Sequence, residues 1–221
     1  MSSESPKHVL FRQFAAVAKA AAHPHRLELL EQLAQGERSV DVLADRIRLS
    51  VANASQHLQH LRRGGLIAAE RRGKFVFYRL TNDAVLDLVA ALRRVAEVQS
   101  AEVERVVRSY FEARDSLEPV TRAELKDRLR AGLVTVLDVR PPDEFALGHL
   151  PDAINVPLGD LERRLAELDP GREIVAYCRG PYCVLSYEAV ARLRARGYTV
   201  RRLEDGYPEW RAAGFPVATG P

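Results

Sequence analysis

Both cysteines of this 221-residue chain lie in one short segment, AYCRGPYCVLS, which spans residues 176–186. Cys178 and Cys183 are five positions apart, with a glycine and a proline between them. Thiols this close are compatible with three kinds of chemistry: a metal site, a disulfide, or a reactive nucleophile with a companion thiol. Which of these is realised depends on the elements that hold the two sulfur atoms.

The cysteine segment joins a predicted strand to a predicted helix. EIVAYC (173–178) is a continuous apolar run, typical of a strand buried on both faces, and LSYEAVARLRARG (185–197) has helical spacing. Cys178 therefore ends the strand, and backbone N–H groups of the loop and of the helix N-terminus are expected to favour its thiolate form. Such a thiolate can attack a sulfane sulfur and carry the resulting persulfide.

The rest of the second half alternates between strand and helix patterns. VTVLDV (134–139) and TVRRL (199–203) are predicted strands, and LGDLERRLAEL (158–168) is a predicted helix. This alternation predicts an α/β domain with a parallel sheet. A break around Pro119 in RDSLEPV serves as the domain boundary. The two expected domains cover residues 1–115 and 116–221.

The first half is predicted to be mainly helical. The first expected helix has Leu10, Phe14, Val17 and Ala21 along one face, and it is followed by HPHRLELLEQLAQG (23–36), SVDVLADRI (39–47) and VANASQHLQHLRR (51–63). The short break between the last two helices is typical of a helix-turn-helix, and a hairpin with Gly73 at its turn follows. From Asn82 to Arg114 the chain has no glycine or proline, so we predict one long helix over 82–113 that pairs with a second copy of the chain.

Positive charge gathers on the predicted helix-turn-helix and hairpin. The chain has a net charge of +3, yet the span from Arg46 to Arg79 holds eight basic residues and one acidic residue. On the helix over 51–63, one face is expected to pack inward, through Val51, Ala54, Ser55, Leu58 and Leu61. The opposite face and the hairpin are predicted to contact DNA, through Asn53, Gln56, His57, His60, Arg63, Arg71, Arg72 and Lys74. The alternative is a solvated polar helix followed by a charged turn.

The first half resembles a known family. Residues 8–113, with SQHLQHL (55–61), GGLI (64–67) and the basic hairpin, are similar to the ArsR-type winged-helix repressors. The resemblance implies a homodimer, formed through the first helix and helix 82–113, that binds an imperfect inverted repeat in double-stranded DNA. The cysteine pair or acidic and histidine ligands of metal-sensing members are absent, so no metal and no cofactor are expected. His23 and His25 are alternative ligands, although a pair at a helix start is more often solvated.

The second half resembles a different family. LDVRPPDEFALGHLPDAINVPL (137–158), AYCRGPYC (176–183) and GYPEWRAAGFPV (206–217) are together similar to a single rhodanese domain over residues 118–218. The resemblance implies that Cys178 is the nucleophile that carries a persulfide and that Asp138 and Arg140 are structural. The substrate-binding loop residues are then Arg179, Gly180, Pro181, Tyr182 and Val184.

Two positions of the loop depart from the commoner rhodanese pattern. Cys183 stands where Arg, Ser or Thr is frequent, which leaves Arg179 as the candidate partner of an anionic donor such as thiosulfate. Phosphatase and arsenate-reductase loops are excluded, because Val184 stands where they need a closing arginine. Cys183 itself has three interpretations: a small buried residue, a metal ligand, or a resolving thiol that attacks the persulfide on Cys178. We favour the resolving thiol.

The two halves together predict a DNA-binding transcriptional regulator that acts as a repressor and responds to reactive sulfur species through Cys178. The sulfane sulfur donor would be thiosulfate, polysulfide or a low-molecular-weight persulfide. The alternative is a rhodanese-type sulfurtransferase with an attached DNA-binding and dimerisation domain, so enzymatic turnover stays open. No run of eighteen apolar residues and no signal-peptide pattern is present, which predicts a cytoplasmic protein without a membrane partner.

Overall fold

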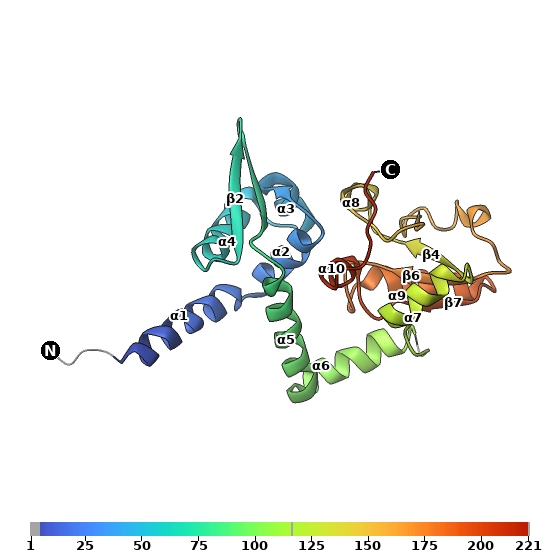
Figure 1. Ribbon diagram of the computed structural model, residues 1–221, viewed down its shortest axis with the longest axis horizontal. Helices are drawn as coiled ribbons and strands as arrows, with labels where there is room; N and C mark the ends of the chain where they lie inside the picture. Colours follow the sequence, from blue (N-terminus) through green and yellow to red (C-terminus); the bar gives the residue numbers. More distant parts are fainter. Residues whose placement is uncertain (1–4, 116, 221) are drawn as a thin grey trace. The chain divides into compact units, whose positions relative to one another are not determined.

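The computed structural model describes residues 5–115 and 117–220, and its contacts divide the chain into two compact units, Met1–Ala91 and Leu92–Pro221 (Figure 1). The division falls within one helix, α5 (Ala84–Gln99). The domain boundary between residues 115 and 116 stays a prediction. Across the described residues, no helix combines the length and the apolar character that crossing a membrane requires.

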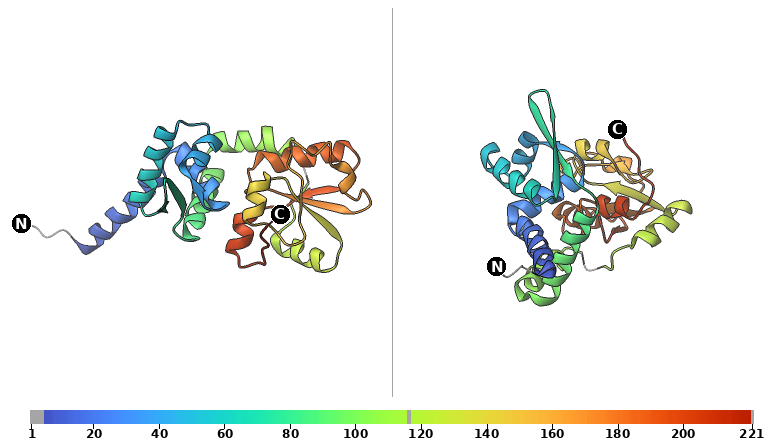
Figure 2. Two further views of the ribbon diagram at one scale, coloured as in Figure 1. Left: turned by 90° about the horizontal axis from the view of Figure 1, so that it is seen from above. Right: turned by 60° about the vertical axis from the view of Figure 1, so that its left-hand side comes forward.

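The first unit is a winged helix-turn-helix. α3 and α4 are the helix pair separated by a short turn, and β2 and β3 form the hairpin, with Gly73 at a φ of 63° between them. The hairpin projects beyond the helices of its own unit in Figure 1 and in the right panel of Figure 2. β3 lies in the middle of an antiparallel sheet of order β1-β3-β2. The bounds are α1 (Pro6–Ala21), α2 (Pro24–Ala34), β1 (Arg38–Ser39), α3 (Val40–Arg46), α4 (Val51–Arg63), β2 (Ile67–Arg72) and β3 (Phe75–Leu80).

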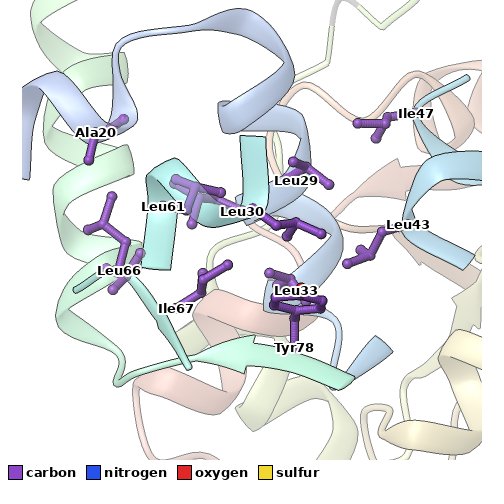
Figure 3. Close-up of a cluster of buried hydrophobic side chains, with 13 residues drawn as sticks. Ala20, Leu29, Leu30, Leu33, Leu43, Ile47, Leu61, Leu66, Ile67 and Tyr78 are labelled. Carbon is purple, nitrogen blue, oxygen red and sulfur yellow. The ribbon is translucent and has the colours of Figure 1, made fainter. Parts of the chain in front are cut away.

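One core holds the helices of this unit to its sheet (Figure 3). α4 contributes Ala54, Leu58 and Leu61, all fully buried, as the spacing of its inner face predicts. Val51 was expected on the same face, but it is 45% exposed. This expectation is wrong because Val51 is the first residue of α4, where the chain enters the helix from a surface turn.

The long helix predicted over residues 82–113 is interrupted. α5 ends at Gln99, α6 spans Ala101–Val106, and a π-helix, η1, spans Val107–Glu112. Ser100 separates the first two because it takes an extended conformation, and its Oγ accepts a hydrogen bond of 3.3 Å from the Val103 N–H. Serine favours this N-cap role over a helix interior, so the absence of glycine and proline did not ensure continuity.

The second unit contains a four-stranded parallel sheet of order β5-β4-β6-β7. Asp138, at the end of β4, pairs in register with Tyr177, at the end of β6, so the carboxyl ends of both strands meet at one edge. The strands are β4 (Val134–Asp138), β5 (Ile154–Asn155), β6 (Glu173–Tyr177) and β7 (Val200–Arg202). The helices are α7 (Arg122–Arg130), α8 (Pro142–Leu147), α9 (Val184–Ala195), α10 (Tyr207–Ala212) and the short 3-10 helix η2 (Leu165–Glu167).

Helices cover both faces of this sheet, as the left panel of Figure 2 shows. Along β6, Ile174 and Ala176 pack in a core with residues of α9, whereas Val175 and Tyr177 pack with Leu125 of α7 and other residues on the opposite face. A strand covered on two sides needs apolar residues at every position, which explains the continuous run in the sequence. The predicted two-domain class, a mainly α winged helix-turn-helix followed by an α/β domain with a parallel sheet, is confirmed.

The helix predicted over residues 158–168 is wrong. The segment forms successive turns, with Asp160 N–H bonded to the Pro157 carbonyl, and only η2 is helical. Gly159 lowers the helix propensity of its start. The Arg164 side chain also donates a 2.8 Å hydrogen bond to the Asn155 carbonyl, which ties the turns to β5.

Candidate functional site

The two cysteines meet at the carboxyl end of β6. Cys178 directly follows the strand and is 1% exposed, while Cys183 is the N-cap residue of α9 and is 6% exposed. The structure joins them in a disulfide, with Cα atoms 6.1 Å apart, inside the range that such a bond requires. The loop therefore brings the predicted carrier and the predicted resolving thiol within bonding reach of each other.

Few backbone N–H and C=O groups of the cysteine loop form hydrogen bonds to one another. The Cys183 N–H bonds to the Gly180 carbonyl at 3.1 Å, and the Cys178 carbonyl accepts from the Tyr207 N–H at 3.1 Å. The N–H groups of Gly180 and Tyr182 donate no hydrogen bond to any of the described residues. These two amides follow Cys178 by two and four positions in the chain, and the described residues leave them unused.

A glycine of the next element allows this loop to pack closely. A side chain at Gly206 would place its Cβ 2.3 Å from the carbonyl carbon of Arg179 and 2.4 Å from the nitrogen of Gly180. The Gly206 N–H donates to the carboxylate of Glu209 at 3.1 Å, at the start of α10. Burial raises the pKa of Glu209 above its ordinary value.

Arg179 is held by an acidic residue that the sequence analysis did not single out. Its Nε and Nη2 form hydrogen bonds to the two oxygens of Glu144, with distances of 2.8 to 3.2 Å, and the Glu144 side chain is fully buried. Glu144 lies in the first turn of α8, just after β4. Because parallel strands β4 and β6 end at the same edge of the sheet, its position in the sequence could have indicated that it lies near the Cys178 loop. The guanidinium that was expected to meet an anionic donor therefore has its charge largely balanced by Glu144.

Asp138 and Arg140 form a fully buried ion pair at the carboxyl end of β4. The guanidinium donates three hydrogen bonds to Asp138, of 3.0 and 3.1 Å from Nε and 2.6 Å from Nη2, and one of 2.8 Å from Nη2 to the Gly148 carbonyl. Burial opposes the charge of Arg140, but the hydrogen bond and the charge of Asp138 outweigh it and raise the pKa of Arg140. The pair fixes the chain at the end of β4, beside the end of β6.

The residues predicted to contact DNA lie on one helix and one hairpin. Ser50 caps α4 by accepting a 3.3 Å hydrogen bond from the Asn53 N–H. Most of the predicted contacts are exposed on α4 and on the hairpin, namely Asn53, Gln56, His60, Arg63, Arg71, Arg72 and Lys74, and His57 is half-buried. Arg72 differs from its neighbours, because its guanidinium bonds to both Glu37 and Glu70.

Comparison with known proteins agrees with this architecture. The helix-turn-helix domain family matches residues 21–69, and the rhodanese-like domain family matches residues 121–213. The HTH-type transcriptional regulator Rv0324 of Mycobacterium tuberculosis is 44% identical over 97% of this chain and 94% of its own length. The chain belongs to this family of HTH-type transcriptional regulators, which join an ArsR-like winged helix to a rhodanese-like domain.

Two partial relatives match one half of the regulator each. A sulfurtransferase from Allochromatium vinosum is 36% identical over 38% of this chain and 78% of its own length. The homodimeric winged helix-turn-helix DNA-binding domain Mb0332 of Mycobacterium bovis, a possible ArsR-family regulator solved by NMR, is 38% identical. That match covers 46% of this chain and 95% of the other, with a TM-score of 0.41.

Three histidines of the regulator gather between α2 and α4. The ring centroid of His57 lies 4.5 Å from that of His23 and 5.6 Å from that of His25. Burial lowers the pKa of His57, and the positive charges of His23, His25, Arg26 and His60 add to the effect. In the described part of the chain, no three His, Cys, Asp or Glu side chains are arranged to hold a metal ion.

The lowered pKa of His57 predicts a loss of stability in acid. Between its ordinary value of 6.5 and its lowered value, the unfolded chain binds more protons than the folded chain, so stability falls as the pH drops below 6.5. His57→Gln should flatten this dependence. Urea midpoints of the wild type and the variant between pH 5 and 8 would measure it, with His8→Gln, an exposed histidine of α1, as control. An unchanged slope in His57→Gln would refute the assignment.

Proposed function

We propose that this regulator binds an imperfect inverted repeat in DNA as a homodimer and responds to reactive sulfur species through Cys178. The exposed polar face of α4 offers amides and a guanidinium for base edges, and the hairpin offers cations for phosphates. The M. bovis domain that matches the first half is described as homodimeric and DNA-binding. Exposed large apolar side chains offer contacts to a second copy on each of two helices, with Leu10, Phe11 and Phe14 on α1 and Leu92, Val95 and Val98 on α5.

The sulfur chemistry proceeds in two balanced steps. The Cys178 thiolate attacks the outer sulfur of a donor persulfide, so that this sulfur moves to Cys178 and the donor leaves as a thiolate. The Cys183 thiolate then attacks the Sγ of Cys178, which forms the disulfide and expels the added sulfur as sulfide. The two cysteines are oxidised and the sulfane sulfur is reduced.

The observation that carries this proposal is the meeting of Cys178 and Cys183 in one loop. Two N–H groups of the same loop, at Gly180 and Tyr182, bond to no described residue, and backbone amides of this kind suit an anionic persulfide. Cys183 lies within bonding distance and at the start of α9, where the helix dipole favours its thiolate form. Arg179 contributes by holding the loop to Glu144, in place of the donor-binding role first expected.

Mass spectrometry and operator binding test the proposal together. Operator fragments are first selected from random DNA with the reduced protein. After polysulfide treatment, we expect Cys178 to gain one sulfur atom, the Cys178–Cys183 disulfide to accumulate, and the electrophoretic mobility shift of the operator to change. An unmodified Cys178, or identical mobility shifts with and without polysulfide, would refute the proposal.

A second function, sulfur transfer as steady turnover, is favoured by the similarity to the A. vinosum sulfurtransferase. The two functions differ in the fate of the persulfide. Sustained thiosulfate:cyanide sulfurtransferase turnover with no disulfide product would support the enzyme. Slow turnover that ends in the Cys178–Cys183 disulfide would support the regulator, because a loop with both cysteines in a disulfide has no thiolate to accept sulfur.

The hairpin should contribute affinity without sequence preference. Lys74 is exposed and forms no ion pair among the described residues, so Lys74→Gln is expected to weaken operator binding roughly two- to tenfold and to lower the salt slope of log K by about 1. Fluorescence anisotropy at several salt concentrations measures both quantities. Lys126→Gln, in the other unit, is the control. Equal salt slopes for Lys74→Gln and the wild type would contradict the phosphate contact.

A further inference from the structure

A residue of the cysteine loop reaches the last turn of α5. Tyr182, which precedes Cys183, donates a 2.7 Å hydrogen bond from its hydroxyl to Oε1 of Glu97. Arg93, one turn earlier on α5, has its Nε 3.6 Å from the same oxygen. Burial, together with the hydrogen bond and the charge of Glu97, raises the pKa of Tyr182, so the hydroxyl keeps the proton that it donates.

The segment that follows α5 is held against the same loop and against α9. The ring of Phe111 in η1 lies 5.1 Å from that of Tyr182 and 4.8 Å from that of Tyr187, measured between centroids. Arg114 donates a 3.2 Å hydrogen bond from Nε to Glu188 of α9. Of these contacts, the two made by Tyr182 depend on the loop that carries the cysteines, whereas the α9 contacts do not.

The loop residue has room to move away from its partners. A cavity of about 560 Å³ opens beside it, and its lining includes Val107, Phe111, Pro181, Tyr182 and Tyr187. The disulfide fixes the residues on both sides of Pro181 and Tyr182, whereas separated thiols, or a persulfide on Cys178, leave the loop less constrained. Breaking the disulfide would therefore relax a constraint on the segment that carries Tyr182.

α5 is also part of the other unit's core. Val85, in its first turn, is buried in the hydrophobic core of the winged helix, and Leu88 and Val89 pack against it. Glu97 lies three turns further along the same helix. A change at Glu97 therefore acts on a helix whose beginning is anchored in the DNA-binding unit.

We propose that the Tyr182–Glu97 hydrogen bond transmits the state of the Cys178–Cys183 loop to α5, and this inference rests on the proposed function. In the disulfide form, Tyr182 is held on Glu97 and Phe111 and orders the end of α5 and the segment through η1. In the reduced or persulfide form, Tyr182 leaves Glu97, and this segment loosens. The end of α5 is ordered in one state and loosened in the other. This difference changes how well the exposed apolar residues of α5 can pair with a second copy of the chain.

Hydrogen exchange of the full-length protein tests this transmission without any DNA. The disulfide form is compared with the form reduced by dithiothreitol, whose two thiols become a cyclic disulfide as the Cys178–Cys183 bond is broken. In the wild type, amides of residues 95–112 should exchange about two- to tenfold faster after reduction, as expected for the loss of one or two weak contacts. Equal exchange in the two forms would overturn the proposal.

Two variants separate the Tyr182 contact from a general effect on the helix. Glu97→Ala removes the acceptor and should exchange fast in both forms, whereas Glu97→Gln keeps an acceptor oxygen and should restore part of the difference. Glu104→Ala is the matched control, because Glu104 also pairs with an arginine one turn away but does not contact the loop. A wild-type difference retained in Glu97→Ala would also overturn the proposal.

Mass spectrometry of the same proteins, reduced and then treated with polysulfide, keeps the two proposals distinguishable. Glu97→Ala should load sulfur on Cys178 to the wild-type extent, because Glu97 contacts only the tyrosine of the loop. If Glu97→Ala loads sulfur normally and keeps the wild-type difference in exchange between the disulfide and reduced forms, transmission through Glu97 is refuted and the sulfur chemistry stands. Failure of the wild type to load Cys178 removes the proposed function itself.

Discussion

Replacing Cys178 with serine is expected to abolish both the sulfur loading of the protein and the response of its DNA binding to polysulfide. A serine hydroxyl is not ionised near neutral pH and is a poor nucleophile towards sulfur, even with the N–H groups of Gly180 and Tyr182 nearby. The wild type should pass through the Cys178 persulfide to the Cys178–Cys183 disulfide and release sulfide, whereas mass spectrometry of Cys178→Ser should detect neither product. Operator affinity without polysulfide should stay near that of the reduced wild type, because residue 178 lies outside the DNA-binding unit.

Cys183→Ser is the informative companion to this variant. It leaves the carrier in place but removes the thiol that forms the disulfide, so the persulfide on Cys178 should accumulate and persist. Release of sulfide should stop. A Cys183→Ser protein that loads Cys178 and still releases sulfide at the wild-type rate would contradict the resolving role. A Cys178→Ser protein that still responds to polysulfide would contradict the carrier role.

Local patterns in the sequence were sufficient to predict the framework of the site. The continuous apolar run 173–178 predicted a strand covered on both faces, and β6 with its two cores confirms it. The spacing of Ala54, Leu58 and Leu61 likewise predicted the buried face of α4. Each of these signals depends on a periodicity within one element, which the sequence displays directly.

The contacts between distant parts of the chain could not be predicted in this way. Glu144 and Arg179 are 35 residues apart, and Glu97 and Tyr182 are 85 residues apart, so no local spacing marks either pair. The prediction of one continuous helix through Ser100 was wrong for a different reason. Serine is tolerated inside helices and also caps them, so its presence does not decide between the two. The turns over 158–168 depend on the tie between Arg164 and Asn155, which is again a tertiary contact.

Replacing Asp138 with asparagine is expected to destabilise the rhodanese-like unit severely. Both side chains of the Asp138–Arg140 pair are 0% exposed, so the variant removes the carboxylate that is hydrogen-bonded to a buried guanidinium and leaves Glu144 as a weaker source of negative charge. Removing one partner of a buried ion pair costs about 3–5 kcal/mol, because the remaining charge keeps its desolvation penalty. Tyr177 and Tyr207 lie against the guanidinium and do not replace a carboxylate.

The loss of stability should be confined to the rhodanese-like unit, and a tryptophan in that unit can report it. Trp210, the single tryptophan, is buried in the core of the second unit, so its fluorescence reports urea unfolding of that unit alone. Asp160→Asn, which breaks an exposed pair with Arg163, should shift this transition by no more than about 0.5 kcal/mol. A similarly small shift for Asp138→Asn would mean that the buried pair does not stabilise the edge of the sheet. Because β4 and β6 end side by side there, a large shift should also expose the Cys178 loop to alkylation after reduction.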